Sequence, residues 1–138
     1  MTEIIPAINA STFDEVVRRI RLAEPHVRMV HIDVADGTFT PHEVWHNAQD
    51  LREFSTSAKI EIHLMVTNPE EKIGPWFMPQ VQRIIFHQEA VKDARALIDH
   101  CHEMRVQAGV SIVPDTSWES LLPYIGSADL FQLLAVSP

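Results

Sequence analysis

The stretch His31-Ile32-Asp33-Val34-Ala35-Asp36-Gly37 decides the fold, because it combines a buried-strand pattern with polar residues and a turn. Short runs rich in valine and isoleucine are typical of parallel strands that are covered on both faces. Alternate side chains of a strand point to the same side, so His31 and Asp33 share one face. Asp36-Gly37 predicts a turn directly after the strand. The sequence therefore predicts a parallel strand with polar side chains at its carboxyl end, where α/β proteins carry their sites.

Runs of the same kind recur on both sides of this stretch, with helical periodicity between them. Strands are predicted at about Glu3–Ile8, Val27–Asp33, Lys59–Met65, Gln82–Phe86, Gln107–Ile112 and Asp129–Val136. Helices are predicted in the gaps, beginning near Thr12, Pro41, Asn68, Val91 and Thr116. Strands and helices that alternate without a linker are typical of one parallel α/β domain, here residues 1–138. Two closures remain open, a doubly wound sheet and part of a (β/α)₈ barrel, since a whole barrel needs about 200–250 residues.

Composition and charge limit the classes of binding partner and the cellular location that we expect for this chain. The chain has 138 residues, 46% of them apolar, and a net charge of −8, which argues against nucleic acid or an anionic membrane as the partner. No apolar run approaches the ~18 residues of a membrane span, and no signal peptide is evident. The single cysteine, Cys101, excludes an internal disulfide and indicates a reducing, cytoplasmic location. The sequence leaves open whether the chain forms a homo-oligomer.

A second polar residue follows the next predicted strand, where His63 precedes Leu64 and Met65. Two imidazoles and one carboxylate from adjacent strands, His31, Asp33 and His63, suit a divalent transition metal such as Zn²⁺ or Fe²⁺. The alternative is that both histidines are hydrogen-bonded interior residues and that Asp33 caps a turn.

Three further signals have competing interpretations. The segment His42–His46 matches His-Glu-x-x-His, the zinc peptidase signature, but is also expected for a polar segment over a barrel mouth. His87 and Glu89 end the fourth predicted strand, where they either belong to the site, as hydrogen-bond partners or as lining residues of the pocket, or have a structural role. Cys101 falls on an apolar helical stripe and is expected to be a small buried hydrophobe.

Two segments resemble the ribulose-phosphate 3-epimerase family. Residues His31–Pro41 are similar to its His-x-Asp-(Val/Ile)-Met-Asp-Gly-x-Phe-(Val)-Pro motif, and His63–Pro69 to its His-Leu-Met-Val-x-x-Pro motif. Weaker, collinear matches lie at Ile5–Ile8, Phe86–Ala90, Ala108–Val110 and Ala135–Pro138.

The resemblance implies a (β/α)₈ TIM barrel, of which this chain supplies about the first six strands. It implies an isomerase of the pentose phosphate pathway that converts D-ribulose 5-phosphate to D-xylulose 5-phosphate by removing and returning the C3 proton through an enediolate. It assigns His31, Asp33 and His63 to a divalent metal (Zn, Fe, Mn or Co) and makes Asp33 an acid/base group. A second aspartate and a phosphate loop belong to later strands of the family, so we expect the chain as given to be incomplete for activity.

The substrate side departs from the family. Ala7 stands where the family has a substrate-binding serine. Asn9, on the same side of the strand, is the first candidate to replace it, and Ser11 is a more distant one. His63 and Met65 are expected beside the substrate as well. Two methionines of the family are Ala35 and Leu134 here, which predicts an altered pocket shape. The competing hypothesis is a diverged or truncated barrel homologue that binds a sugar phosphate without catalysis.

Overall fold

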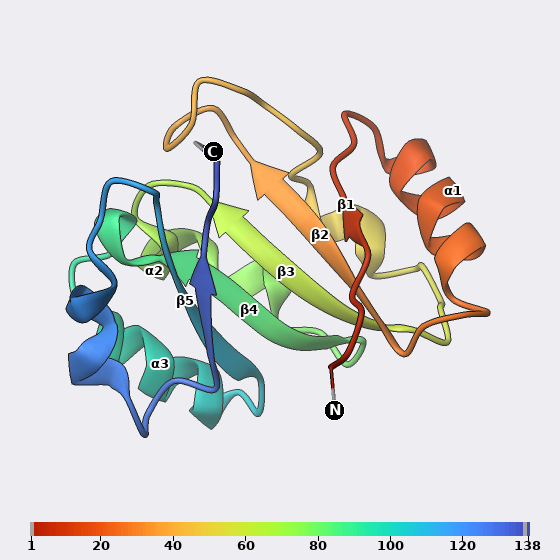
Figure 1. Cartoon of the computed structure of the whole chain (residues 1–138). Coiled ribbons are helices and arrows are strands. Elements are labelled where there is room, and N and C mark those ends of the chain that lie inside the picture. Colours follow the sequence, from red (N-terminus) through yellow and green to blue (C-terminus); the bar gives the residue numbers. More distant parts are fainter. Residues whose placement is uncertain (1, 137) are drawn as a thin grey trace.

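Six strands form one parallel sheet in the computed structural model, which describes residues 2–136 and 138. Their order follows the sequence, and their arrowheads lie at one edge of a curled sheet (Figure 1). The strands are β1 (Ala7–Ile8), β2 (Met29–Ala35), β3 (Lys59–Met65), β4 (Val81–His87), β5 (Gln107–Ile112) and β6 (Leu130–Leu133). The middle strands match the prediction closely, whereas β1 and β6 are shorter than the predicted runs Glu3–Ile8 and Asp129–Val136.

The connections carry α-helices and short 3₁₀ turns. The α-helices are α1 (Phe13–Ala23), α2 (Pro69–Lys72) and α3 (Ala94–Glu103), and the 3₁₀ turns are η1 (Ala48–Leu51), η2 (Gly74–Trp76), η3 (Gln88–Ala90) and η4 (Trp118–Tyr124). The predicted start of the first helix is confirmed, because the hydroxyl of Thr12 accepts a hydrogen bond from the amide of Glu15. Among the described residues, no helix combines the length and the apolar character needed to cross a membrane.

The prediction of a second helix after Pro41 is wrong. The backbone amide of Val44 donates to the carbonyl of Ala35, and that of Trp45 donates to the carbonyl of Ala10, so neither amide is available for a helical hydrogen bond. Only η1 forms there, and it still buries Leu51. The fifth predicted helix is likewise the 3₁₀ turn η4, which contains Pro123. In both segments the apolar spacing reflects burial without an α-helix.

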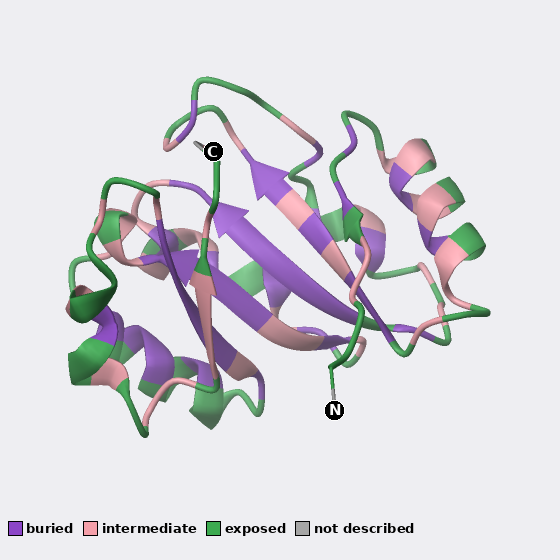
Figure 2. Cartoon of the chain, viewed as in Figure 1, coloured by how far each residue is buried: buried purple, intermediate pink, exposed green. Residues whose placement is uncertain are grey.

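The two faces of the sheet differ in chemistry. On the helix-covered face, side chains such as Ile32, Ile62, Ile84 and Val110 are fully buried and pack with α1 and α3 in one apolar cluster. Figure 2 shows β2 to β5 largely buried, whereas β6 is partly exposed, as are the outer sides of the helices. The opposite face, here called the inner face, lies within the curl of the sheet. A cavity on that face is lined from both β1 and β6, the two edge strands.

The curled sheet confirms the α/β class and the arc of a parallel (β/α)₈ barrel. Within the described residues, β1 pairs only with β2 and β6 pairs only with β5, so the arc is open at both edges.

Candidate metal and substrate site

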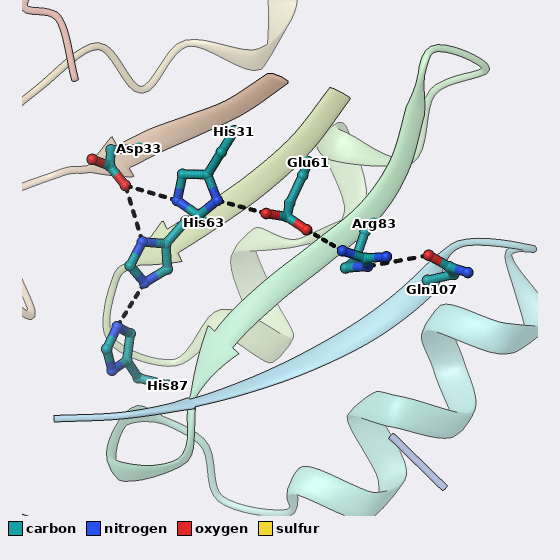
Figure 3. Close-up of polar contacts among 7 residues, drawn as sticks. All are labelled: His31, Asp33, Glu61, His63, Arg83, His87 and Gln107. Carbon is teal, nitrogen blue, oxygen red and sulfur yellow. Dashed lines mark hydrogen bonds and ion pairs between the residues drawn. The ribbon is translucent and has the colours of Figure 1, made fainter. Parts of the chain in front are cut away.

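Three polar side chains converge near the carboxyl ends of β2 and β3. Asp33 and His63 are direct neighbours in the parallel register, and His31 lies two residues before Asp33. Asp33 Oδ1 is 3.2 Å from His31 Nε2 and 3.0 Å from His63 Nδ1 (Figure 3). One potential ligand atom from each of the three residues lies within 4.8 Å of the other two. The strand spacing that suggested this group therefore does bring its members together.

A cavity of about 420 Å³ opens beside this group on the inner face. The residues predicted to contact substrate all line it: Ala7, Asn9, His63 and Met65. The two departures in pocket shape, Ala35 and Leu134, line it too. Asn9 also orients the site, since its side-chain amide donates to Asp33 Oδ2 over 3.1 Å.

The electrostatics of the group follow from burial and from its carboxylates. Burial alone would lower the pKa of His31, but its hydrogen bonds with Asp33 and Glu61 raise that pKa to about 9. Burial opposes ionisation of Asp33, yet the hydrogen bonds from His31 and His63 hold its pKa well below the usual range. Burial lowers the pKa of His63. At neutral pH, His31 thus carries a hydrogen on each ring nitrogen, with Nδ1 facing Glu61 and Nε2 facing Asp33.

The donor set fits a divalent transition metal. Imidazole nitrogens and a carboxylate oxygen suit zinc, iron, manganese and cobalt, and each ligand histidine needs its other nitrogen fixed by a partner. His31 Nδ1 lies 2.6 Å from Glu61 Oε1, and His63 Nε2 lies 2.8 Å from His87 Nε2. Both histidines can therefore keep a hydrogen on the far nitrogen and present the other nitrogen to a cation beside Asp33.

His87 belongs to the surroundings of this group. It is fully buried at the end of β4, and its Nδ1 is 3.5 Å from the carboxylate of Glu89. Burial and the neighbouring His63 lower the pKa of His87 to about 4, so it is neutral and able to accept the hydrogen of His63. Of its two interpretations, the structure favours the one in which His87 is a hydrogen-bond partner.

Sequence reasoning overlooked Glu61 and Arg83. Ile60 pairs with Val81, but a one-residue shift then places Glu61 opposite Arg83 instead of Gln82. Such a bulge turns the following side chains to the other face. The alternation of side chains along a strand could have placed Glu61 on the same face as His63. No pattern in the sequence predicts the register shift that turns Arg83 towards the inner face.

The structure also decides between the competing interpretations of the His-Glu-x-x-His segment and shows the surroundings of Cys101. Residues 42–46 form no helix, so His42 and His46 do not share the helical face that the peptidase signature requires. His42 instead lines the cavity with Thr40, as expected for a segment over the barrel mouth. Cys101 is fully buried on α3, and burial raises the pKa of its thiol to about 12. A thiol in that state is a poor nucleophile at neutral pH.

Comparisons with known proteins agree with this architecture. The family model described as the Ribulose-phosphate 3 epimerase family matches residues 3–138. The chain is 30% identical over 137 residues to the ribulose-phosphate 3-epimerase of Chlamydia trachomatis, covering 98% of this chain and 59% of that protein. It is 30% identical over 138 residues to that of Treponema pallidum, covering 98% and 63%. It is also 30% identical over 141 residues to the cytoplasmic isoform of Oryza sativa, covering 97% and 60%.

The chain spans 52% and 59% of the lengths of two chlamydial relatives, and the match extends over nearly all of its own residues. Both motif segments that carried the resemblance lie inside the matched region. The chain therefore belongs to the ribulose-phosphate 3-epimerase family.

Proposed function

We propose that this chain is part of a metal-dependent epimerase that acts on a ketose 5-phosphate, interconverting D-ribulose 5-phosphate and D-xylulose 5-phosphate. The observation that carries the proposal is the convergence of His31, Asp33 and His63 within 4.8 Å beside a cavity of about 420 Å³. The names of the relatives in the comparisons support the same activity. In this proposal the three residues hold the metal, and Ala7, Asn9, His63 and Met65 border the sugar.

Asp33 is the acid/base group in this scheme. Its Oδ1 faces both histidines, whereas its Oδ2 accepts only the amide hydrogen of Asn9 among the described residues. We assign removal of the substrate C3 proton to Oδ2, since the depressed pKa of Asp33 keeps the carboxylate ionised at neutral pH. When bound, the metal supplies positive charge that stabilises the negative charge developing on the substrate oxygens.

Inversion at C3 also needs a proton donor on the opposite face of the enediolate. The family resemblance places that donor, an aspartate, on a seventh strand, whereas the sheet described here has six. Exchange of the C3 proton on one face needs only the carboxylate of Asp33, so this exchange is the step that we test.

The test is proton exchange in D₂O, followed by ¹H NMR. The chain is incubated with Zn²⁺, Mn²⁺, Fe²⁺ or Co²⁺ and, separately, with each of the two pentulose 5-phosphates. We expect metal-dependent loss of the C3 hydrogen signal from one epimer only. Asp33→Asn abolishes this loss, while the control His100→Gln, an exposed position on α3, leaves it unchanged.

The same samples test the non-catalytic alternative, which Ala7 and Ala35 favour because they alter the cavity wall. In the sample with diamagnetic Zn²⁺, sugar-phosphate signals that are broadened or shifted relative to Zn²⁺ without protein, with no deuterium uptake, would support a binding protein. A metal-loaded chain that neither exchanges the proton nor perturbs either sugar phosphate would overturn both hypotheses.

A further inference from the structure

Four polar side chains form a continuous string across the inner face, one from each of four neighbouring strands. His31 Nδ1 lies 2.6 Å from Glu61 Oε1, and Arg83 Nη1 donates to Glu61 Oε2 over 2.5 Å. Arg83 Nε then donates to Gln107 Oε1 over 3.1 Å. Figure 3 shows the string running from β2 through β3 and β4 to β5, away from Asp33. The string therefore starts at a proposed metal ligand and leads into the body of the sheet.

The string is buried and specific. The side chains of Glu61 and Arg83 are 5% and 15% exposed, so this ion pair is largely shielded from solvent. Removing one partner of such a pair leaves an uncompensated buried charge, which is strongly destabilising. The pair also depends on the one-residue shift between Ile60 and Glu61, without which Gln82 would face Glu61.

We propose that Glu61 is the positioning residue for His31, and that Arg83, braced by Gln107, holds Glu61 in place. This inference rests on the proposed function, because it concerns how that site presents its ligand. A carboxylate accepts hydrogen bonds but donates none, so the contact between Glu61 and His31 requires a hydrogen on Nδ1. A neutral imidazole with its hydrogen on Nδ1 carries its lone pair on Nε2. Nε2 is the nitrogen that faces Asp33.

Arg83 fixes the orientation of the Glu61 carboxylate by binding the oxygen that does not face His31. One oxygen of Glu61 faces His31 and the other faces Arg83, so rotating the carboxylate would break both contacts. Gln107 fixes the guanidinium in turn. Partners of this kind, which hold ligand histidines in one tautomer, change metal affinity about 10–100-fold when they are replaced.

The test compares two double variants that differ only at position 61, where glutamine can accept a hydrogen bond and leucine cannot. Glu61→Leu/Arg83→Leu removes the acceptor and both charges together, a replacement of a buried ion pair that folded proteins often tolerate. Glu61→Gln/Arg83→Leu keeps a carbonyl oxygen for His31. Co²⁺ affinity is measured by calorimetry and by visible absorption, which reports the coordination of the ion. Glu24→Gln is the control, since Glu24 is a carboxylate held by Thr56 and Arg21 outside the site.

We expect the Leu/Leu variant to bind Co²⁺ about 10–100-fold more weakly than the wild type. The Gln/Leu variant recovers only part of that loss, because the acceptor for His31 is restored while Arg83, which holds it in place, is still missing. Glu24→Gln retains wild-type affinity. Equal affinities of the two double variants, or a Leu/Leu variant with wild-type affinity, would overturn the positioning role. Failure of the wild type itself to bind Co²⁺ would instead overturn the proposed function.

A second measurement needs no variant and applies if the Leu/Leu chain does not fold. Long-range ¹H–¹⁵N NMR of the Zn²⁺-loaded wild type reports which ring nitrogen of His31 carries the hydrogen. We expect a protonated Nδ1 and a metal-bound Nε2. A hydrogen on Nε2 would contradict the proposal, since Glu61 would then have no hydrogen to accept.

Discussion

Gly109→Ala offers a stringent test of the packing beneath the site. Gly109 lies on β5, opposite Ile85 of β4 and Leu130 of β6. A Cβ placed there would lie 2.7 Å from Ile85 Cγ1 and 3.3 Å from Leu130 Cδ2. Strand preference alone favours alanine over glycine by about 0.5–1 kcal/mol. Overpacking costs about 1–3 kcal/mol, and it dominates here because Ile85 is branched at Cβ and held between strands.

The net expectation is a loss of about 1–2 kcal/mol in the free energy of unfolding, equivalent to a decrease of roughly 3–8 °C in Tm. Urea unfolding can be followed by fluorescence, because Trp45 and Trp76 are 5% and 4% exposed. Gly74→Ala is the matched control, since an added Cβ there meets nothing within 4 Å. We expect the control to lie within about 0.5 kcal/mol of the wild type. A Gly109→Ala chain as stable as the wild type would refute the close approach of β4 and β5.

Three shorter predictions concern other parts of the molecule. His63→Ala is expected to abolish Zn²⁺ binding in calorimetry while His42→Ala does not, and sub-nanomolar affinity of the wild type would contradict a site with three protein ligands. Native Cys101 should react slowly with iodoacetamide at pH 8 and rapidly in urea, because it is buried and its pKa is about 12; fast alkylation of the folded chain would be inconsistent with this. Hydrogen bonds, mainly from Thr56 and then from Arg21, lower the pKa of Glu24 from 4.5 to about 2. The ionised Glu24 therefore stabilises the folded chain above pH 4.5, and this contribution is lost as the pH falls towards 2. The Tm of Glu24→Gln should therefore lie below that of the wild type at pH 7, and the two should converge in acid; a difference independent of pH would exclude this cause.

The predictability of the fold varied along the chain for identifiable reasons. The bounds of β3 and β5 match their predicted ranges because apolar runs bounded by polar residues admit few alternatives. The segment after Pro41 was wrongly predicted as a helix because Val44, Ala48 and Leu51 recur at a spacing that suits one. The amides of Val44 and Trp45 instead donate hydrogen bonds to the carbonyls of Ala35 and Ala10. Periodicity records which side chains are buried, and it does not record which carbonyl each amide contacts.

Some residues of the candidate site could likewise be predicted from the sequence, and others could not. His31, Asp33 and His63 could be grouped from the sequence, because they need only the period-two rule and a parallel register. Arg83 could not be added, because its inward direction depends on a one-residue shift between β3 and β4. Pairing between strands is set by the packing of whole strands, which a local pattern does not encode.

The alternation of faces along the strands has a consequence for how mutations would distribute in this protein. Apolar positions of β2 and β3 on the helix-covered face carry even numbers, while the polar site occupies odd ones. In β4 the apolar series begins at Val81 and continues at Ile84, because the shift changes the parity. A saturation scan should thus show two interleaved stripes, one governing protein abundance and one governing ligand chemistry. A single inserted or deleted residue near Gln82 would exchange the two stripes along β4 and impair both properties at once.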